Sequence, residues 1–322
     1  MTLRQLTYVL AVADAGSFTE AARRLHVSQP SLSQQVRALE EELGGRLLER
    51  PPRPVRLTAA GRAFVAEARP AVSAARRASD AARATFEHGV SELRVATVRS
   101  LAVSQLPAAI RRWRSTHPGM TVHLNEYAHR EIAGRSVLDG ESELGIAPRP
   151  LDWPGPVERL GWDQLVAVLP RSDPLLASAR LDLRLVAGRD WVLFEPGHGL
   201  AEIAGWAFER AGFDPNGVAY TAQVEAAARL AAAGVGPALV PVKTVPAEFV
   251  ENTRPLDPPV VWEISAFAAG DGWSAQNAEL VSALRGADWE RRRPEGAVQV
   301  KLERLGSAPA RAHSTRSPTA RP

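Results

Sequence analysis

The sequence predicts an α/β protein with a helical head, one long helix and a larger second half of alternating strands and helices. Three observations lead to this fold class. Two short helical patterns surround a tight turn in residues 17–42, and a heptad repeat follows from Thr58. From Leu93 onward, short apolar runs alternate with amphipathic patterns, which favours a parallel sheet covered by helices.

The composition excludes several classes of protein. A chain of 322 residues with 45% hydrophobic residues is long enough for more than one domain. It contains no cysteine, which excludes disulfides, thiolate metal sites and cysteine nucleophiles. No apolar run approaches the roughly 18 residues of a membrane span, and no leader pattern opens the chain, so we expect a cytoplasmic protein. The formal net charge is +3, and nearly all cations are arginine, which can equally reflect a GC-rich genome.

Three helices are predicted before residue 43. The first ends at Gly16, a residue that readily takes the left-handed conformation. Ser17 and Glu20 form an S-x-x-E pattern, which predicts a capping box at the start of the second helix. Ser28 is expected to cap the third helix, with Pro30 in its first turn.

The third helix combines an apolar stripe with a hydrogen-bonding face. Leu32, Val36 and Leu39 form the stripe, and amide, hydroxyl and guanidinium groups occupy the rest. Such groups read base edges in the major groove, and a second helix in this position fits helix-turn-helix docking. The alternative is a solvated amphipathic hairpin that binds nothing. The candidate base-reading residues are Ser28, Gln29, Ser31, Ser33, Gln34 and Arg37.

Residues 49–58 predict an extended hairpin rich in proline and arginine. Residues 55–57, Val-Arg-Leu, have the composition of a short strand. Arg53 and Arg56 would lie along a phosphate backbone, where arginines add affinity without reading sequence. A proline-stiffened linker is the alternative interpretation.

A heptad repeat indicates one helix from Thr58 to about Phe86. Such a helix would be about 40 Å long at 1.5 Å per residue, more than a linker needs unless it pairs with a partner. We therefore expect it to dimerise, the alternative being a helix packed on its own domain. The predicted seam consists of Phe64, Ala68, Ala71, Ala75, Ala78 and Ala82.

The remaining chain predicts two lobes joined by two crossing strands, with a cleft between them that is the default place for a small ligand. We expect a head at 1–60, the long helix at 58–87, and a two-lobed domain at 90–285. Lobe I would comprise 90–163 and 267–285, and lobe II 164–266. Residues 286–322 are rich in arginine and proline, which predicts a disordered basic tail. Such a tail could add nonspecific DNA affinity or be an unselected extension.

Several motifs together resemble the LysR-type transcriptional regulators. The run F-T-E-A-A-R-R-L-H-V-S-Q-P-S-L-S-Q-Q-V-R-A-L-E-E-E-L-G, followed by L-L-E-R and V-R-L-T-A-A-G, is similar to the amino-terminal domain of that family. Residues 211–215, Ala-Gly-Phe-Asp-Pro, and 239–241, Leu-Val-Pro, are similar to its effector-binding domain. The resemblance covers about residues 2–285 and implies a winged helix-turn-helix, a dimerisation helix and a domain like periplasmic binding proteins. The proline-rich residues 51–54 depart from the family's usual wing tip.

The resemblance also implies an effector site in the cleft, lined by the loops after the first and third strands and by two segments of lobe II. Ser100 would cap the helix that follows, and free N–H groups at such an end favour an anion, so we expect a small carboxylate. Alternatives are a plain cap for Ser100, a surface ion pair for Arg99 and a solvated loop position for His198. By position, the candidate residues are Arg99, Ser100, Leu101, Ala147, Phe194, His198, Thr221 and Val224.

Together these features predict a dimeric or tetrameric transcription regulator that responds to a small effector. Its expected partners are a roughly palindromic double-stranded DNA, a second copy of itself and an anionic effector, with RNA polymerase as a further candidate. An effector-independent architectural DNA binder is the alternative. An enzyme is a third hypothesis, but the sequence has no G-x-S-x-G elbow, P-loop, dinucleotide glycine motif or metal-spaced His/Cys cluster. No cofactor or metal is expected.

Overall fold

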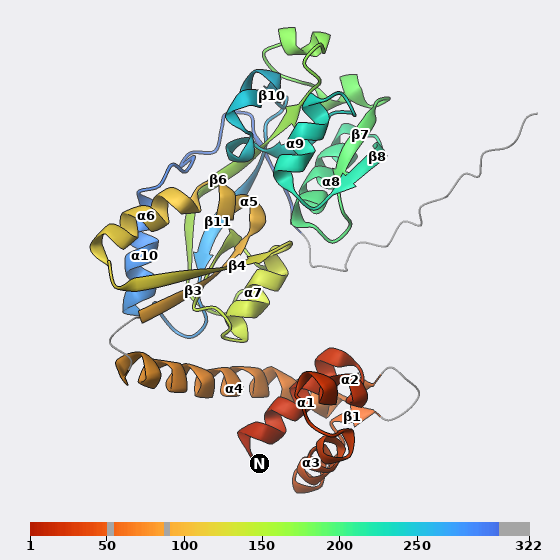
Figure 1. Ribbon diagram of the computed structural model, residues 1–322. Helices are drawn as coiled ribbons and strands as arrows, with labels where there is room; N and C mark the ends of the chain where they lie inside the picture. The colour runs from red at the N-terminus through yellow and green to blue at the C-terminus, as the bar shows by residue number, and fades with distance from the viewer. Residues whose placement is uncertain (50–54, 87–90, 303–322) are drawn as a thin grey trace, which may run out of the picture.

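The computed structural model describes residues 1–49, 55–86 and 91–302. A small helical head and the long helix α4 lie on one side of two stacked lobes (Figure 1). The head contains α1 (Leu3–Ala15), α2 (Phe18–Arg24) and α3 (Gln29–Glu42), then the two-residue strands β1 (Leu48–Glu49) and β2 (Arg56–Leu57). The three helices confirm the sequence prediction, and Gly16 ends α1 at φ +59° in the left-handed region.

Side-chain caps define where the helices of the head begin. Ser17 Oγ accepts from the Glu20 amide at 3.4 Å, and Ser28 Oγ accepts from the Ser31 amide at 3.4 Å, so both predicted caps are confirmed. The reciprocal half of the capping box at Glu20 is wrong. Its carboxylate instead accepts from Arg23 and Arg24, since guanidinium groups three and four residues along a helix lie within reach of a glutamate.

Glu40, on the buried side of α3, joins this helix to the start of the β1–β2 hairpin. Its Oε1 accepts from the backbone N–H groups of Leu47 at 2.9 Å and Leu48 at 3.1 Å. Leu48 and Glu49 then pair in antiparallel fashion with Leu57 and Arg56. The carboxylate therefore accepts the hydrogen bonds of two backbone N–H groups at the start of this short hairpin.

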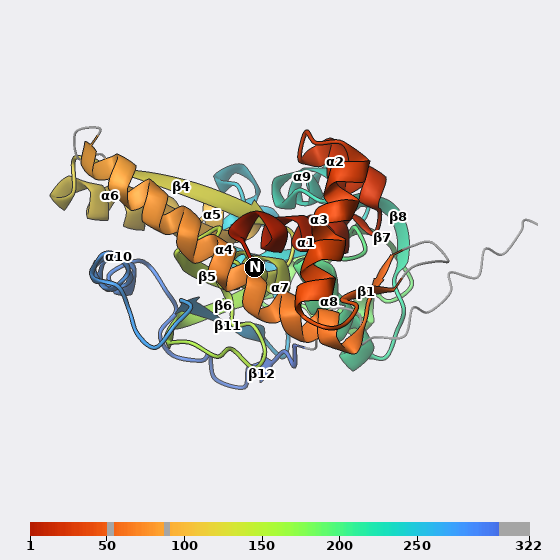
Figure 2. The same cartoon turned by 90° about the horizontal axis from the view of Figure 1, so that it is seen from below.

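The long helix α4 (Ala59–Phe86) is continuous through Pro70. Part of its predicted seam is used within the chain, because Ala68 is buried against Leu6 and Leu10 of α1, with Phe64 packed beside it. Ala68 is therefore packed within its own chain and Phe64 is half-buried there, while pairing of the seam with a second copy stays a prediction. The two helices lie side by side in Figures 1 and 2, which is how the head is attached to α4.

Lobe I is built on a mixed sheet. Strand β3 (Ser91–Val98) pairs in parallel with β4 (Met120–Tyr127) and β5 (Leu144–Pro148). However, β11 (Val260–Phe267) is antiparallel to both β5 and β6 (Val157–Val168). The predicted parallel pairing is therefore confirmed for β3, β4 and β5, whereas β11 is antiparallel because the chain leaves lobe I on β6 and returns on β11 in the opposite direction.

Helices cover both faces of this sheet (Figure 1). On one face, α6 (Leu106–Thr116) and α10 (Ala275–Arg285) pack with Leu93 and Val95 of β3. On the other, α7 (Arg130–Leu138) covers Ala96. Successive side chains of β3 thus point to opposite faces of the sheet, as expected for a strand buried on both sides.

Lobe II has a smaller set of strands. The parallel pair β7 (Asp190–Phe194) and β8 (Asn216–Thr221) stands beside α8 (Gly199–Ala211) and α9 (Val224–Ala232). Trp191 and Phe208 meet edge to face with ring centroids 4.7 Å apart, in the core of this lobe. The shorter elements are β9 (Ala238–Pro241), β10 (Thr253–Pro255) and the 3₁₀ turns Pro174–Ala177, Leu183–Val186, Val242–Thr244 and Ala247–Asn252.

The two crossing strands belong to both lobes. β6 pairs with β11 up to Gln164 and then with β9 and β10 from Leu165 to Val168. The border predicted at residue 266 is displaced, because β11 already pairs with β5 of lobe I from Ile264 onward. One sheet thus extends across both lobes, while β7 and β8 form a separate two-stranded sheet in lobe II.

The chain remains folded beyond α10, which corrects the prediction of a disordered tail from residue 286. The indole Nε1 of Trp289 donates to the Leu284 carbonyl at 2.7 Å, and β12 (Val298–Gln299) adds a parallel strand to β11. Ala297 and Val300 are buried there. Burial of these apolar side chains stabilises a segment whose arginine-rich composition had suggested disorder. The predicted tail from 303 to 322 lies outside the described residues.

Asp163 is a buried carboxyl group at the point where β6 passes between the lobes. Its side chain is 3% exposed, and Oδ1 accepts from the Gln164 amide at 2.8 Å. Burial raises the pKa of Asp163 to about 7, against the opposing effects of that hydrogen bond and of Lys243.

Within the described residues, no helix is long and apolar enough to span a membrane.

We expect Glu40→Ala to lower the free energy of unfolding by about 1–3 kcal/mol, because two buried N–H groups lose their acceptor. Glu40→Gln keeps an acceptor oxygen and should cost less. Urea unfolding of both variants measures the difference. Equal losses in the two variants would contradict a specific role for the hydrogen bonds.

Replacing Asp163 with asparagine should change how stability depends on pH. The folded pKa of about 7 lies above the unfolded value, so the stability that the protonated carboxyl contributes is present below about pH 4 and is lost as pH rises to about 7. Asp163→Asn removes this titration. Its melting temperature should exceed that of the wild type more at pH 8 than at pH 5, as measured by thermal unfolding. The same difference at both pH values would be evidence of no titration.

Candidate functional site

The polar face of α3 is exposed to solvent, and its apolar face is buried. Leu32, Val36 and Leu39 are fully buried in the core of the head. The other side of the helix places amide, hydroxyl and guanidinium groups in solvent, as major-groove docking requires. Of the predicted residues, Ser33 is half-buried, and the exposed ones are Ser28, Gln29, Ser31, Gln34 and Arg37.

Two further residues complete the description of this face. Gln35, absent from the prediction, is exposed beside Gln34 and carries the same amide group, so its residue type was an available signal. Arg56 is exposed on β2, the second strand of the short hairpin. Arg53 lies outside the described residues.

The seam of α4 beyond the head is only partly covered. Ala71 and Ala78 are exposed and Ala75 is half-buried. The Ala82 side chain lies outside the part of the chain whose side chains are described. Small residues of this kind allow a second helix to approach closely.

A narrow cavity separates the two lobes. Its walls include Arg99, Ser100, Arg130, His198, Leu200 and Trp262. The enclosed volume is about 20 Å³, room for about one water molecule. An organic ligand therefore requires the lobes to move apart or these side chains to rearrange.

The structure brings Arg99, Ser100 and His198 of the predicted effector site together at this cavity. Helix α5 (Arg99–Val103) begins two residues earlier than expected, with Val98 at the N-cap position, so Ser100 is buried inside the helix and the prediction that it caps the helix is wrong. Leu101 and Ala147 are fully buried in hydrophobic clusters of lobe I, which corrects their placement as cleft residues.

The other predicted residues of lobe II do not line the cavity. Phe194 is buried and its ring stacks on His198, with centroids 4.9 Å apart. Val224 is buried in the same core, and Thr221 is half-buried at the end of β8. Phe194 thus supports the cleft through His198.

His198 is a buried cap and not the solvated loop residue that its surroundings suggested. It is 6% exposed, and its Nδ1 accepts from the Leu200 amide at 3.1 Å at the start of α8. Burial, with Arg99 and His129, lowers the pKa of His198 to about 4, although the Ala222 backbone opposes the shift. The ring is therefore neutral at physiological pH with its proton on Nε2, which is buried without a hydrogen bond of normal geometry.

Sequence reasoning missed a second cation of the cleft, Arg130, beside the predicted Arg99. It lies at the first position of α7, three residues after β4, and lines the cavity while only 3% exposed. A charged residue just beyond the carboxyl end of a parallel strand is a known position for ligand contacts in α/β sheets, so a signal was present.

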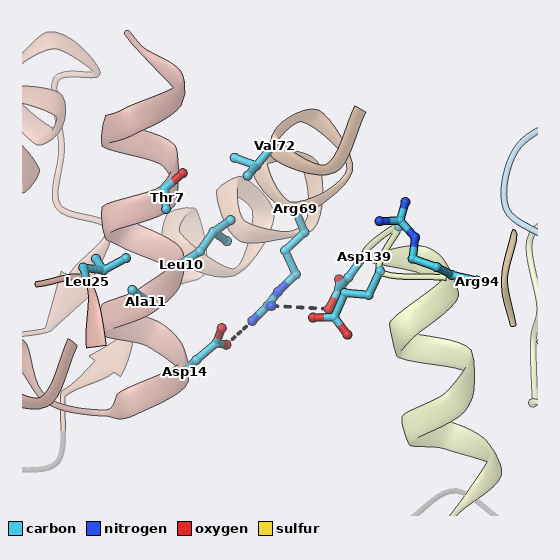
Figure 3. A pocket seen from close by; sticks show the side chains of 11 residues that line it. Thr7, Leu10, Ala11, Asp14, Leu25, Arg69, Val72, Arg94 and Asp139 are labelled. Atoms are coloured by element: carbon cyan, nitrogen blue, oxygen red, sulfur yellow. Dashed lines mark hydrogen bonds and ion pairs between the residues drawn. The ribbon is translucent and has the colours of Figure 1, made fainter. Parts of the chain in front are cut away.

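A second pocket lies between the head and lobe I, with a volume of about 420 Å³. Arg69 of α4 stands at its centre and forms ion pairs with Asp14 of α1 and, at 3.3 Å, with Asp139 at the end of α7 (Figure 3). Burial raises the pKa of Asp139 even though Arg69 opposes the shift. A single guanidinium therefore connects the head, the long helix and lobe I.

Comparison with known proteins gives a family match for the helical head and another for the two-lobed domain. The family model of the bacterial regulatory helix-turn-helix protein, LysR family, matches residues 3–62, and that of the LysR substrate binding domain matches residues 87–285. The chain is 33% identical over 244 residues to the HTH-type transcriptional regulator TcbR of Pseudomonas sp. (strain P51), covering 75% of this chain and 83% of TcbR. It is 34% identical over 247 residues to ClcR of Pseudomonas putida, again covering 75% and 83%.

A solved structure has the same arrangement of parts. The full-length CbnR structure in complex with its target DNA is 29% identical, with a TM-score of 0.59, covering 89% of this chain and 99% of CbnR. The order of a helix-turn-helix head and a two-lobed domain is thus shared with regulators of transcription. This chain belongs to the LysR family of transcriptional regulators and is a DNA-binding protein with an effector-binding domain, not an enzyme.

Proposed function

We propose that this regulator reads a roughly palindromic operator through α3 and that a small organic anion in the inter-lobe cleft controls its action. The observation that carries the first part is the exposed row Gln34, Arg37 and Ser31 on a helix whose back is buried. Gln34 and Arg37 lie three residues apart, on one side of the helix. Bidentate contacts with adenine and guanine suit these two side chains.

A symmetric pair of heads is the simplest way to read a palindrome. The exposed Ala71 and Ala78 of α4 support dimerisation through the distal part of that helix. Because alanines bury little area, further contacts would help hold a dimer or tetramer together. RNA polymerase is a proposed further partner, and the cytoplasm the proposed location, both supported by the family's role in transcription.

An anion fits the electrostatics of the cleft. The amino-terminal ends of α7 and α8 meet there, and such ends carry partial positive charge. Arg99 and Arg130 line the cavity between them, and the buried Nε2 of His198 can donate a hydrogen bond. A carboxylate would satisfy all three kinds of group.

The ion pairs of Arg69 offer a route from the cleft to the head. Asp139 ends the same helix, α7, that begins at the cleft with Arg130. Movement of α7 when the lobes open would change the Arg69 contacts and, with them, the orientation of the head. A ligand that binds one lobe arrangement better would then shift the population of head arrangements.

Replacing Gln34 and Arg37 together with alanine should lower the preference for the operator over random DNA by at least about 30-fold. Each base contact of this kind contributes about 1–3 kcal/mol of discrimination. Binding-site selection followed by competition binding measures the ratio. Circular dichroism and the oligomeric state should remain those of the wild type.

Two control variants make this result specific. Arg56→Ala should weaken binding to all sequences alike and reduce its salt dependence, because a phosphate contact carries no sequence information. Arg111→Ala, on the exposed side of α6, should change neither quantity. An operator preference that survives the double substitution would refute base reading by α3.

Small carboxylic acids should raise the melting temperature of the full-length protein, since a ligand that binds only the folded state stabilises it. Acetate, succinate, maleate and benzoate form the test panel, with succinamide and benzamide as neutral controls. Arg99→Gln should weaken binding of an active acid by about tenfold or more, through loss of a charged hydrogen bond. If no acid stabilises the protein, the effector-independent DNA binder becomes the better description.

A further inference from the structure

Two segments from opposite lobes meet at a buried charged cluster beside the cleft. The Glu202 carboxylate of α8, in lobe II, accepts from Arg130 Nη1 at 2.6 Å and lies 3.1 Å from His129 Nε2, both of lobe I. Next to them, the Gly199 backbone N–H donates to the Ala128 carbonyl at 2.8 Å. Three contacts within one turn of α8 thus join the lobes.

The tautomer of His129 follows from the hydrogen bond that its Nδ1 accepts. Its Nδ1 accepts from the Glu131 amide at 3.2 Å at the start of α7, so the neutral ring carries its proton on Nε2. That proton points to the Glu202 carboxylate. One Glu202 oxygen therefore receives hydrogen bonds from an imidazole and a guanidinium, which are the donors that a carboxylate effector would use.

Burial makes this arrangement sensitive to the loss of one partner. His129 is 2% and Arg130 3% exposed. Arg130 has two carboxylates close by, Glu202 and, at 3.5 Å from its Nε, Glu131. Without Glu202, the guanidinium would lose the shorter of these two contacts, and contact with water would offset the loss.

The same Arg130 lines the cavity between the lobes. With Glu202 in place, the cavity of about 20 Å³ is closed and its cation is engaged by a carboxylate of the protein itself. Glu202 therefore has the chemistry of an internal substitute for an anionic ligand.

We propose that Glu202 is an inter-lobe latch that holds the cleft closed and competes with an anionic effector for Arg130 and His129. An entering carboxylate displaces Glu202 from this pair, and the lobes separate as the Glu202 contacts break. The closing function of the latch stands on the contacts alone, whereas the competition rests on the proposed carboxylate effector.

Spin-label distances within the full-length chain test the latch. The chain has no cysteine, so Arg135→Cys on α7 and Gly205→Cys on α8 introduce two unique labelling sites. Arg135 is exposed, and a Cβ at Gly205 meets open space. Labelled protein is mixed with excess unlabelled protein, so that electron–electron double resonance reports distances within one chain.

Without added ligand, the labelled wild type should give a single short distance. Glu202→Gln and Arg130→Gln should each shift the distribution to longer distances, and the double variant should shift it no further, since both changes break the same pair. Glu209→Gln, two turns further along α8 and exposed, is the matched control and should superimpose on the wild type. A Glu202→Gln distribution identical to the wild type overturns the latch.

Affinity for maleate and benzoate tests the competition. Glu202→Gln should bind the active acid about tenfold more tightly than the wild type, and Arg130→Gln should bind it at least about tenfold more weakly. Unchanged affinity in Glu202→Gln overturns the competition while leaving the effector proposal intact. If neither acid binds any variant but the distances still shift, the latch stands and the carboxylate effector fails.

Discussion

The antiparallel pairing of β6 with β11 is the constraint on which the two-lobed domain depends. These strands carry the chain out of lobe I and back, and their ladder continues into β5 on one side and into β9 and β10 on the other. Because both lobes are hydrogen-bonded to the same two strands, they can move only by bending or twisting this pair. The buried Asp163 lies within it, where a charged carboxylate is costly.

With β6 and β11 as the hinge, the contacts between the lobes at the cleft determine how far the lobes can move apart. The Glu202, Arg130 and His129 cluster joins the lobes, and α7 runs from this cluster to Asp139, which pairs with Arg69. In the proposed mechanism, a movement at one end of α7 reaches the head through these contacts. The proposed open and closed clefts would then be the two states that an effector and the head both bias.

Sequence periodicity predicted most elements because helix caps and strand alternation are local. Gly16 and Ser28 delimit helices wherever those helices pack, and the Leu32, Val36 and Leu39 stripe defines the back of α3. Predictions that required long-range partners fared worse. Arg130 was missed because its partner Glu202 is 72 residues away, and the folding of residues 286–302 depends on an edge of β11.

The sequence by itself determined the type of protein and the reading face of its head, because residue type and helical spacing specify a polar recognition helix without reference to the rest of the chain. Only the tertiary structure showed that Ala68 packs against α1 of the same chain, with Phe64 beside it. It also decided which residues line the cleft and that His198 is buried and neutral. Burial and charge pairing depend on segments far apart in the chain, and only folding brings those segments together.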